Sequence, residues 1–413
     1  MLKLFFILTF LFVVNSAFAR KFTVPLHKIE SGRSQLLKQG TWSQFLSTTH
    51  SNSNLPSFRR DSESRYNYLE AEYVVSSTVG TPGQTFYTIP STKSDLSWVV
   101  NESCGNKSAE CSSLCRGAYC EYLCSAECCV GNGDPACRIR QKFNPEESQS
   151  YQPSNDTFQQ YTAIGRILGE YGTDKWNVEG LNRFTVKEHR FGVINSMEDE
   201  YLDYTFDGVL GLGRSTGENE FKPLLVQAIE EHLLDEPIVS LYFKDLSHNR
   251  QGQVGGGITF GGIDNQHCGI VLDSVPLISS DQWSFRLNEA KVNRRTVTGG
   301  DTVIDSSSAY IHFPVNDVEL FITVINATYD VKNELFTVDC HSDFTFTVTI
   351  GKHVYPVDQK LLIKEYDRQR CELMIKRTYS WQAHSWVLGI PFVESYCTVL
   401  DYGGRISFAA IIQ

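Results

Sequence analysis

Two segments of the same kind, one in each half of the chain, constrain its fold more than any other feature. In the second half an apolar run ends at residues 304–308 (IDSSS), and in the first half a similar run ends at residues 91–94 (STKS). Each segment is followed, further along its half of the chain, by two apolar residues and a glycine: residues 209–211 in the first half and 387–389 in the second. No repeat with a period of about 20–50 residues accompanies this duplication, which disfavours solenoids and propellers. The sequence therefore predicts two related lobes.

The rest of the pattern is that of a β protein. Residues 72–79 (EYVVSSTV) and 343–350 (DFTFTVTI) carry β-branched and aromatic side chains, which is typical of strands. Residues 221–234 have the best helical spacing of apolar side chains. With 413 residues, the chain is long enough for two lobes that each bury a core. We expect an all-β protein.

Charge is unevenly spread along the chain. The formal net charge is -11, which argues against a nucleic-acid partner. Through residue 65 there are 9 basic and 3 acidic residues, against 37 and 48 in the whole chain, so the remainder carries -17. A basic leader before an acidic body indicates a propeptide that covers an acidic cleft, and a flexible basic tail is the alternative. Residues 51–62 are rich in Ser, Asn and Pro, as in a linker.

The N-terminus predicts export from the cell. Lys3 precedes an apolar run at residues 4–14, and residues 17–19 (AFA) form a small-residue cleavage site, as in a secretory signal peptide. A membrane anchor is the alternative, but the run is too short to span a bilayer and no later stretch reaches that length. We expect a signal peptide at 1–19, a basic propeptide and linker at 20–65, an N-terminal lobe at 66–245 and a C-terminal lobe at 246–413.

Twelve cysteines in an exported chain predict disulfides. Eight of them lie in a Cys-rich insertion at 104–137: Cys104, Cys111, Cys115, Cys120, Cys124, Cys128, Cys129 and Cys137. The other four are Cys268, Cys340, Cys371 and Cys397. A zinc site in the insertion is the alternative, because some spacings there are metal-like. An oxidising compartment and the even count favour bridges. Sequons for N-glycosylation, at Asn101, Asn106, Asn155 and Asn326, agree with the secretory pathway.

Six sequence blocks in a fixed order carry a resemblance to a known family. They are residues 24–28 (VPLHK), 67–84 (ending in GTPGQ), 142–151, 206–213 (FDGVLGLG), 258–264 (ITFGGID) and 386–409. On these blocks the chain resembles the pepsin-like (A1) aspartic peptidases, particularly the secreted or lysosomal ones of nematodes. The resemblance covers nearly everything from residue 24 on. It implies an all-β, bilobal fold with a cleft between two pseudo-symmetric lobes, a peptide or protein ligand in that cleft, and neither cofactor nor metal.

The resemblance also locates the active-site positions. In the family the first motif reads Asp-Thr-Gly-Ser and runs on to Trp-Val. Residues 84–99 match it without a gap, with Ser91 at the Asp position and Lys93 at the Gly position. The second motif keeps Asp305, but Ser307 replaces its Gly. The neighbours that keep a hydroxyl are Thr92 and Ser306.

These substitutions remove one catalytic group. The family mechanism, as the resemblance implies it, uses one ionised and one protonated Asp that act together as base and acid. The hydroxyl of Ser91 does neither, and its presence should cost roughly 10²–10⁴-fold in rate or more. The ammonium of Lys93 either lies near Asp305 and favours the carboxylate form, or points to solvent. Asp95 does not replace the lost carboxylate, since the match has no gap, and no histidine is an obvious partner for Ser91 as a nucleophile.

Two further regions depart from the family pattern. Counting from Asp174 puts Thr162 where the family flap has a tyrosine, with Tyr161 one position off. A slip of one residue turns a strand's side chain to the other face, so no flap tyrosine is assigned. The Cys-rich insertion stands where the family more often has a short loop with one bridge. By the same resemblance Cys340 pairs with Cys371, which leaves Cys268 for Cys397, and the eight cysteines from 104 to 137 pair among themselves.

The sequence favours a secreted, catalytically inactive homologue of an aspartic peptidase, with the lysosome as the other destination. We expect a monomer that binds a peptide or protein ligand in its cleft, and also its own propeptide. Two alternatives stay open. One is a weak or atypical aspartic-type endopeptidase that uses Asp305, and the other is an interaction module that acts through the Cys-rich insertion.

Overall fold

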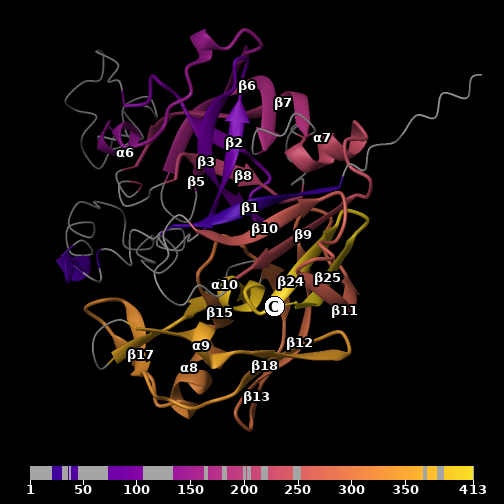
Figure 1. Ribbon diagram of the computed structural model, residues 1–413. Helices are drawn as coiled ribbons and strands as arrows, with labels where there is room; N and C mark the ends of the chain where they lie inside the picture. Colours follow the sequence, from indigo (N-terminus) through magenta and orange to yellow (C-terminus); the bar gives the residue numbers. More distant parts are fainter. Residues whose placement is uncertain are drawn as a thin grey trace, which may run out of the picture.

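The computed structural model describes residues 21–29, 36, 39–44, 73–105, 134–161, 166–178, 184–198, 201, 206–214, 222–244, 253–365, 370–378 and 386–412. In this part of the chain Figure 1 shows two lobes, the N-terminal half in indigo to magenta above and the C-terminal half in orange to yellow below. Strands dominate both lobes, and helices are few and short. The prediction of an all-β, bilobal fold is confirmed.

The largest sheet runs through both lobes. Its strands lie in the order β11-β25-β24-β9-β10-β1-β2-β3-β8-β4-β7-β6-β5. Their bounds are β1 Phe22–Lys28, β2 Tyr73–Val79, β3 Gln84–Ser91, β4 Trp98–Val100, β5 Gln152–Tyr161, β6 Arg166–Val178, β7 Thr185–Met197, β8 Gly208–Gly211, β9 Ile238–Phe243, β10 Val254–Phe260, β11 Cys268–Pro276, β24 Tyr396–Asp401 and β25 Arg405–Ile411.

Two smaller sheets belong to the C-terminal lobe. One has the order β19-β18-β12-β14-β23-β15-β22, with β13 paired to β12, and the other has the order β16-β17-β21-β20. The bounds in the first are β12 Ser284–Val292, β13 Arg295–Thr298, β14 Asp301–Ile304, β15 Ile311–Pro314, β18 Phe346–Ile350, β19 His353–Val357, β22 Ile375–Thr378 and β23 Trp386–Leu388. Those in the second are β16 Thr328–Asp330, β17 Leu335–Asp339, β20 Ile363–Glu365 and β21 Arg370–Leu373.

Short helices connect the strands: α6 Asp134–Arg138, η4 Pro145–Glu147, α7 Leu224–Glu230, α8 Val315–Val324, α9 Gln359–Leu362 and α10 Ile390–Val393. The helix expected at residues 221–234 is therefore shorter than its apolar pattern. It begins after Pro223, whose ring favours a first-turn position and offers no N–H. Just beyond its end, His232 has a positive φ of 54°, which no helical residue adopts.

The duplicated motif of the sequence is a duplicated structure. In the N-terminal lobe, β3 ends at Ser91 and pairs in parallel with β8, which ends at Gly211. In the C-terminal lobe, β14 ends at Ile304 and pairs in parallel with β23, which is followed by Gly389. A Cβ at Gly211 would meet the Asp95 carbonyl oxygen, and one at Gly389 would meet that of Tyr310. Glycine at both places lets another part of the backbone approach the motif closely.

The leader supplies a strand to the middle of the large sheet. Strand β1 pairs antiparallel with β10, starting at Phe22↔Phe260, and with β2 at His27↔Val74. Figure 1 shows it crossing the molecule between the upper lobe and β10. Val24 and Leu26 are fully buried, since alternate residues of a strand face the same side. Strand β1 of the leader is thus part of the packed core.

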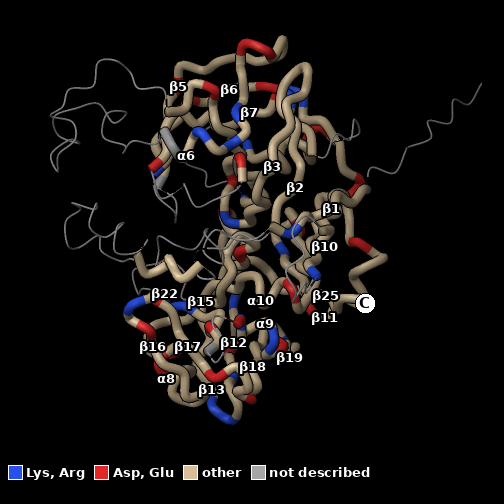
Figure 2. The backbone as a smooth tube through the Cα atoms, turned by 60° about the vertical axis from the view of Figure 1, so that its left-hand side comes forward, with Lys and Arg blue, Asp and Glu red and all other residues tan. Residues whose placement is uncertain are grey.

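Three disulfides join described residues. Cys104–Cys137 closes the Cys-rich insertion, Cys268–Cys397 links β11 to β24, and Cys340–Cys371 links the residue after β17 to β21. The last two are the pairings that the resemblance implies. The other six cysteines lie outside the described residues, as does the expected signal peptide. Within the described part, no helix is long and apolar enough to cross a membrane. Figure 2 shows acidic and basic residues interspersed over both lobes.

Candidate functional site

The two motifs meet where the lobes face each other, through a symmetric set of hydrogen bonds. The backbone N–H of Thr92 donates to Ser306 Oγ, and that of Ser306 donates to Thr92 Oγ1, both at 3.1 Å. The Thr92 hydroxyl donates to the carbonyl of Ile304 (2.9 Å), and the Ser306 hydroxyl to that of Pro90 (2.8 Å). All four bonds are buried and join residues more than 200 positions apart. We call this arrangement the Thr92–Ser306 clasp, and it fixes one motif against the other.

The clasp brings Ser91 close to the remaining carboxylate, with Ser307 between them. The Ser307 hydroxyl donates to Asp305 Oδ1 at 2.5 Å, and the Ser307 backbone N–H donates to the same oxygen at 2.9 Å. Ser91 Oγ lies 3.2 Å from Ser307 Oγ. Because Ser307 gives its single hydroxyl hydrogen to Asp305, the Ser91 hydroxyl is the donor to Ser307.

A chain of hydroxyl donors therefore ends on one carboxylate. Ser91 Oγ accepts in turn from the backbone N–H of Ser94 at 3.2 Å, so both functions of this hydroxyl are used. Ser91 is fully buried, and Asp305 is 6% exposed. Asp305 Oδ1 accepts both of its hydrogen bonds from Ser307, one from the hydroxyl and one from the backbone N–H. The site is ordered, but it has one carboxylate instead of two.

Lys93 does not pair with this carboxylate. The side chain is exposed, and no hydrogen bond or ion pair joins it to Asp305 in the described part of the chain. Of the two orientations that the sequence leaves open, the structure has the one toward solvent. Its charge is still felt at His312, whose pKa is lowered well below its ordinary value by burial first, then by Lys376 and Lys93.

The histidine beside the second motif bonds to a different serine. His312 Nε2 lies 3.0 Å from Ser308 Oγ, and both residues are buried. Ser91 contacts Ser307 and Ser94 instead. A histidine-activated nucleophile at Ser91 therefore finds no support in this geometry, in agreement with the sequence.

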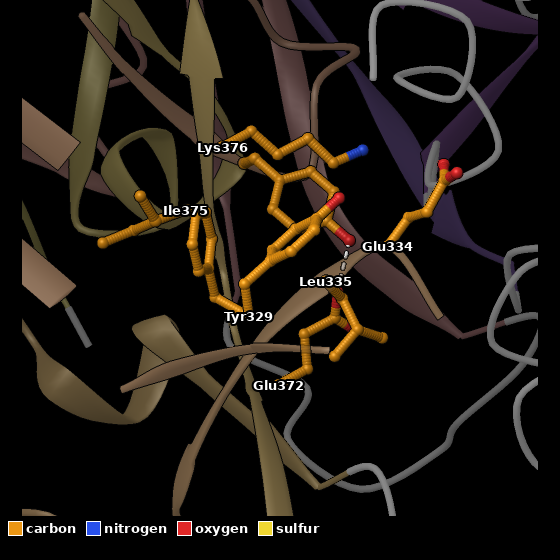
Figure 3. Close-up of a pocket in the computed structure, with 8 residues that line it drawn as sticks. Tyr329, Glu334, Leu335, Glu372, Ile375 and Lys376 are labelled. Carbon is orange, nitrogen blue, oxygen red and sulfur yellow. Dashed lines mark hydrogen bonds between the residues drawn. The ribbon is translucent and has the colours of Figure 1, made fainter. Parts of the chain in front are cut away.

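A pocket in the C-terminal lobe lies next to the second motif. It is lined by Tyr310, Tyr329, Glu334, Leu335, Phe336, Glu372, Ile375 and Lys376, which are drawn in Figure 3. The Tyr310 hydroxyl donates to Glu372 Oε1 at 2.5 Å, and the Lys376 ammonium lies 4.1 Å from the centre of the Tyr310 ring. Glu372 and Lys376 are both buried. Sequence reasoning missed this pocket, because its residues come from both small sheets and share no motif.

The leader reaches the same region. Trp42 is 2% exposed, and its indole N–H donates to the carbonyl of Asn333 at 2.8 Å. Its ring belongs to the apolar cluster of the N-terminal lobe that includes Ile89, Leu96 and Trp98. One leader side chain therefore contacts both lobes close to the motif strands.

Other predicted site residues have separate places. Asn155 and Asn326 are exposed, as glycan acceptors must be. Asn101 is buried and its amide donates to Asn195 Oδ1 at 2.6 Å, so a glycan there would have to replace this bond. Asn106, Thr162, the side chain of Tyr161 and most of the Cys-rich insertion lie outside what the structure describes.

Comparisons with known proteins identify the family of this chain. A sequence model of the family described as "Eukaryotic aspartyl protease" matches residues 72–411. The chain is similar to "Aspartic protease 2" of Necator americanus, at 26% identity over 98% of this chain and 99% of that protein. It is similar to "Aspartic protease 1" of Caenorhabditis elegans, at 28% identity over 97% of each. It is also similar to "Pepsin-3" of Oryctolagus cuniculus, at 28% identity over 92% of each.

Proposed function

Since the chain belongs to the family of eukaryotic aspartyl proteases, we propose that it binds peptide or protein ligands between its lobes without cleaving them. Peptide hydrolysis in such a site needs two carboxylates that share a proton, one acting as base toward water and the other as acid toward the leaving amine. This chain offers Asp305 alone. Ser91, at the other position, neither takes up nor releases a proton at acidic or neutral pH.

The hydrogen-bond chain from Ser91 through Ser307 to Asp305 supports this proposal most directly. A catalytic water would have to sit against Asp305 and be activated there. Oδ1 of that carboxylate already accepts two hydrogen bonds from Ser307. The Ser307 hydroxyl also fills the space between the two motif positions, a space that glycine leaves open in the family pattern.

The Thr92–Ser306 clasp supports the binding half of the proposal. All four of its hydrogen bonds are present, although the chemistry that such a frame would support is absent. The clasp holds the two motifs in register across the space between the lobes. We propose that the frame is kept because the protein still binds a ligand there.

We propose further that the protein is exported from the cell. The apolar run at residues 4–14, the small residues at 17–19 and the sequons support a secreted glycoprotein. The three disulfides among the described residues fit an oxidising compartment. We propose a secreted monomer whose own leader is one of its ligands, with the lysosome as the other destination.

Retention of intact peptides is the test. A degenerate mixture of peptides is incubated with the unmodified full chain and, separately, with the full chain carrying Trp42→Ala. The bound peptides are then recovered and their masses are measured by mass spectrometry. Intact peptides retained by either protein support the proposal. Peptides recovered as fragments, or no peptide retained by either protein, contradict it. The variant is included because Trp42 of the leader is hydrogen-bonded to Asn333 in the unmodified chain, and on this proposal it competes with a free peptide.

A further inference from the structure

The leader places an indole at the junction of the two lobes, and this contact is specific in two ways. The Trp42 ring is buried in the apolar cluster that contains Ile89, Leu96 and Val209 of the N-terminal lobe. Its N–H donates to the carbonyl of Asn333, 291 residues away, in the turn between β16 and β17 of the C-terminal lobe. A single side chain thus uses an apolar surface on one lobe and a hydrogen-bond acceptor on the other.

This contact lies beside the motif strands and the pocket described above. Ile89 precedes Ser91 by two residues on β3 and pairs in register with Val209 on β8. Asn333 immediately precedes Glu334, which lines the C-terminal pocket (Figure 3). The position of Trp42 therefore belongs to one apolar cluster with residues of the motif strands β3 and β8, and it is hydrogen-bonded to the residue that precedes Glu334 of the Tyr310 pocket.

The contact selects tryptophan over other apolar side chains. A buried indole N–H usually finds an acceptor, and for Trp42 the acceptor is a backbone carbonyl whose place is set by the turn. Phenylalanine would supply ring surface and leave that carbonyl without its donor. The chain therefore contains a subsite with the shape and polarity of an indole.

We propose that the ligand of the interlobe site is a peptide that presents a tryptophan in the place that Trp42 holds in the leader. This inference rests on the proposed function and names the ligand class. The leader is an intramolecular copy of the ligand. Because it is tethered, its effective concentration is on the order of millimolar, so it excludes a free peptide of moderate affinity.

The test uses a synthetic peptide with the sequence of residues 36–44 (LLKQGTWSQ) and the full chain carrying Trp42→Ala. We expect this peptide to bind the variant at least about tenfold more tightly than the unmodified chain, where the leader competes. Replacing the peptide tryptophan by alanine should weaken binding by more than about thirtyfold, as for a buried aromatic anchor. Replacing it by 3-benzothienylalanine, which keeps the shape and lacks the N–H, should cost about two- to tenfold.

One control variant keeps the test decisive. The Trp42→Phe chain retains ring volume without the N–H, so it should bind the peptide more tightly than the unmodified chain even if Trp42→Ala impairs folding. Equal affinity of the tryptophan and alanine peptides, or equal affinity of the unmodified and variant chains, overturns the inference. Intact peptides retained from the degenerate mixture without enrichment in tryptophan overturn this inference alone. Failure to retain any peptide overturns the proposed function as well.

Discussion

At the scale of single residues, Ser307 determines the hydrogen bonding of the site as much as Ser91 does. Its hydroxyl lies 2.5 Å from Asp305 Oδ1 and 3.2 Å from Ser91 Oγ, so it connects the two motif positions. The hydroxyls satisfy one another and the carboxylate in a buried place, where an unpaired polar group would be costly. The side chain that blocks catalysis in the proposed function therefore also stabilises the hydrogen-bonded arrangement of the site.

Removing this connection should destabilise the protein. Ser307→Ala leaves the buried Ser91 hydroxyl without its acceptor and takes one donor from Asp305, which should cost about 1–3 kcal/mol in the free energy of unfolding. Urea denaturation measures the change. Ser280→Ala, at an exposed serine, is the matched control and should stay within about 0.5 kcal/mol of the unmodified protein. An equally small effect at Ser307 would contradict the hydrogen-bond chain.

A buried histidine should make the protein less stable in acid. His189 is fully buried, and burial lowers its pKa to about 4, partly opposed by the hydrogen bond that its Nδ1 makes to Gln227 Oε1. The unfolded chain takes up the proton near pH 6.5, and the folded chain takes it up only near pH 4. The stability that neutral His189 contributes is therefore fully present above pH 6.5. It falls by up to about 3 kcal/mol as the pH drops through this window.

The check compares unfolding free energies of the unmodified protein and His189→Leu between about pH 7 and pH 4. Any pH-independent cost of the substitution cancels when only the slopes are compared. The unmodified protein should lose more stability toward pH 4 than the variant does. Parallel slopes for the two proteins would show that the folded and unfolded chains bind the proton at His189 equally well, and would contradict this prediction.

At the scale of elements, the disulfides fasten strands that are distant in sequence. Cys268–Cys397 closes a separation of 129 residues at the edge of the large sheet, and Cys340–Cys371 closes one of 31 within the small sheet. On the chain-entropy estimate the longer closure contributes about 5 kcal/mol and the shorter about 4 kcal/mol. Each value is comparable to the total stability of many domains.

Cys340→Ser and Cys268→Ser should both lower the yield of secreted protein, and Cys268→Ser should lower it more. The measurement is the amount of protein in the medium of expressing cells, with thermal unfolding of whatever is recovered. Double variants that also replace the partner cysteine separate loss of the bridge from exposure of a free thiol. Unchanged yield for both double variants would mean that the bridges contribute little.

At the scale of the whole molecule, the sequence predicts the frame well and the contacts between lobes poorly. Ser91 and Lys93 stand out because they interrupt a long ungapped match, and Thr92 and Ser306 keep the hydroxyls that form the clasp. The position of Ser307 between two motifs depends on how the lobes face each other, which no local pattern encodes. The same holds for Trp42 and Asn333, and for the pocket around Tyr310.

The central claim is that this scaffold lacks the second catalytic carboxylate and therefore does not cleave peptides. The most direct measurement is the rate of cleavage of a denatured protein between about pH 3 and pH 7, with and without pepstatin, by the unmodified chain and by Ser91→Asp/Lys93→Gly/Ser307→Gly. We predict no cleavage by the unmodified chain, and pepstatin-sensitive cleavage by the triple variant that Asp305→Ala abolishes. Pepstatin-sensitive cleavage by the unmodified chain that is lost on Asp305→Ala would contradict the account.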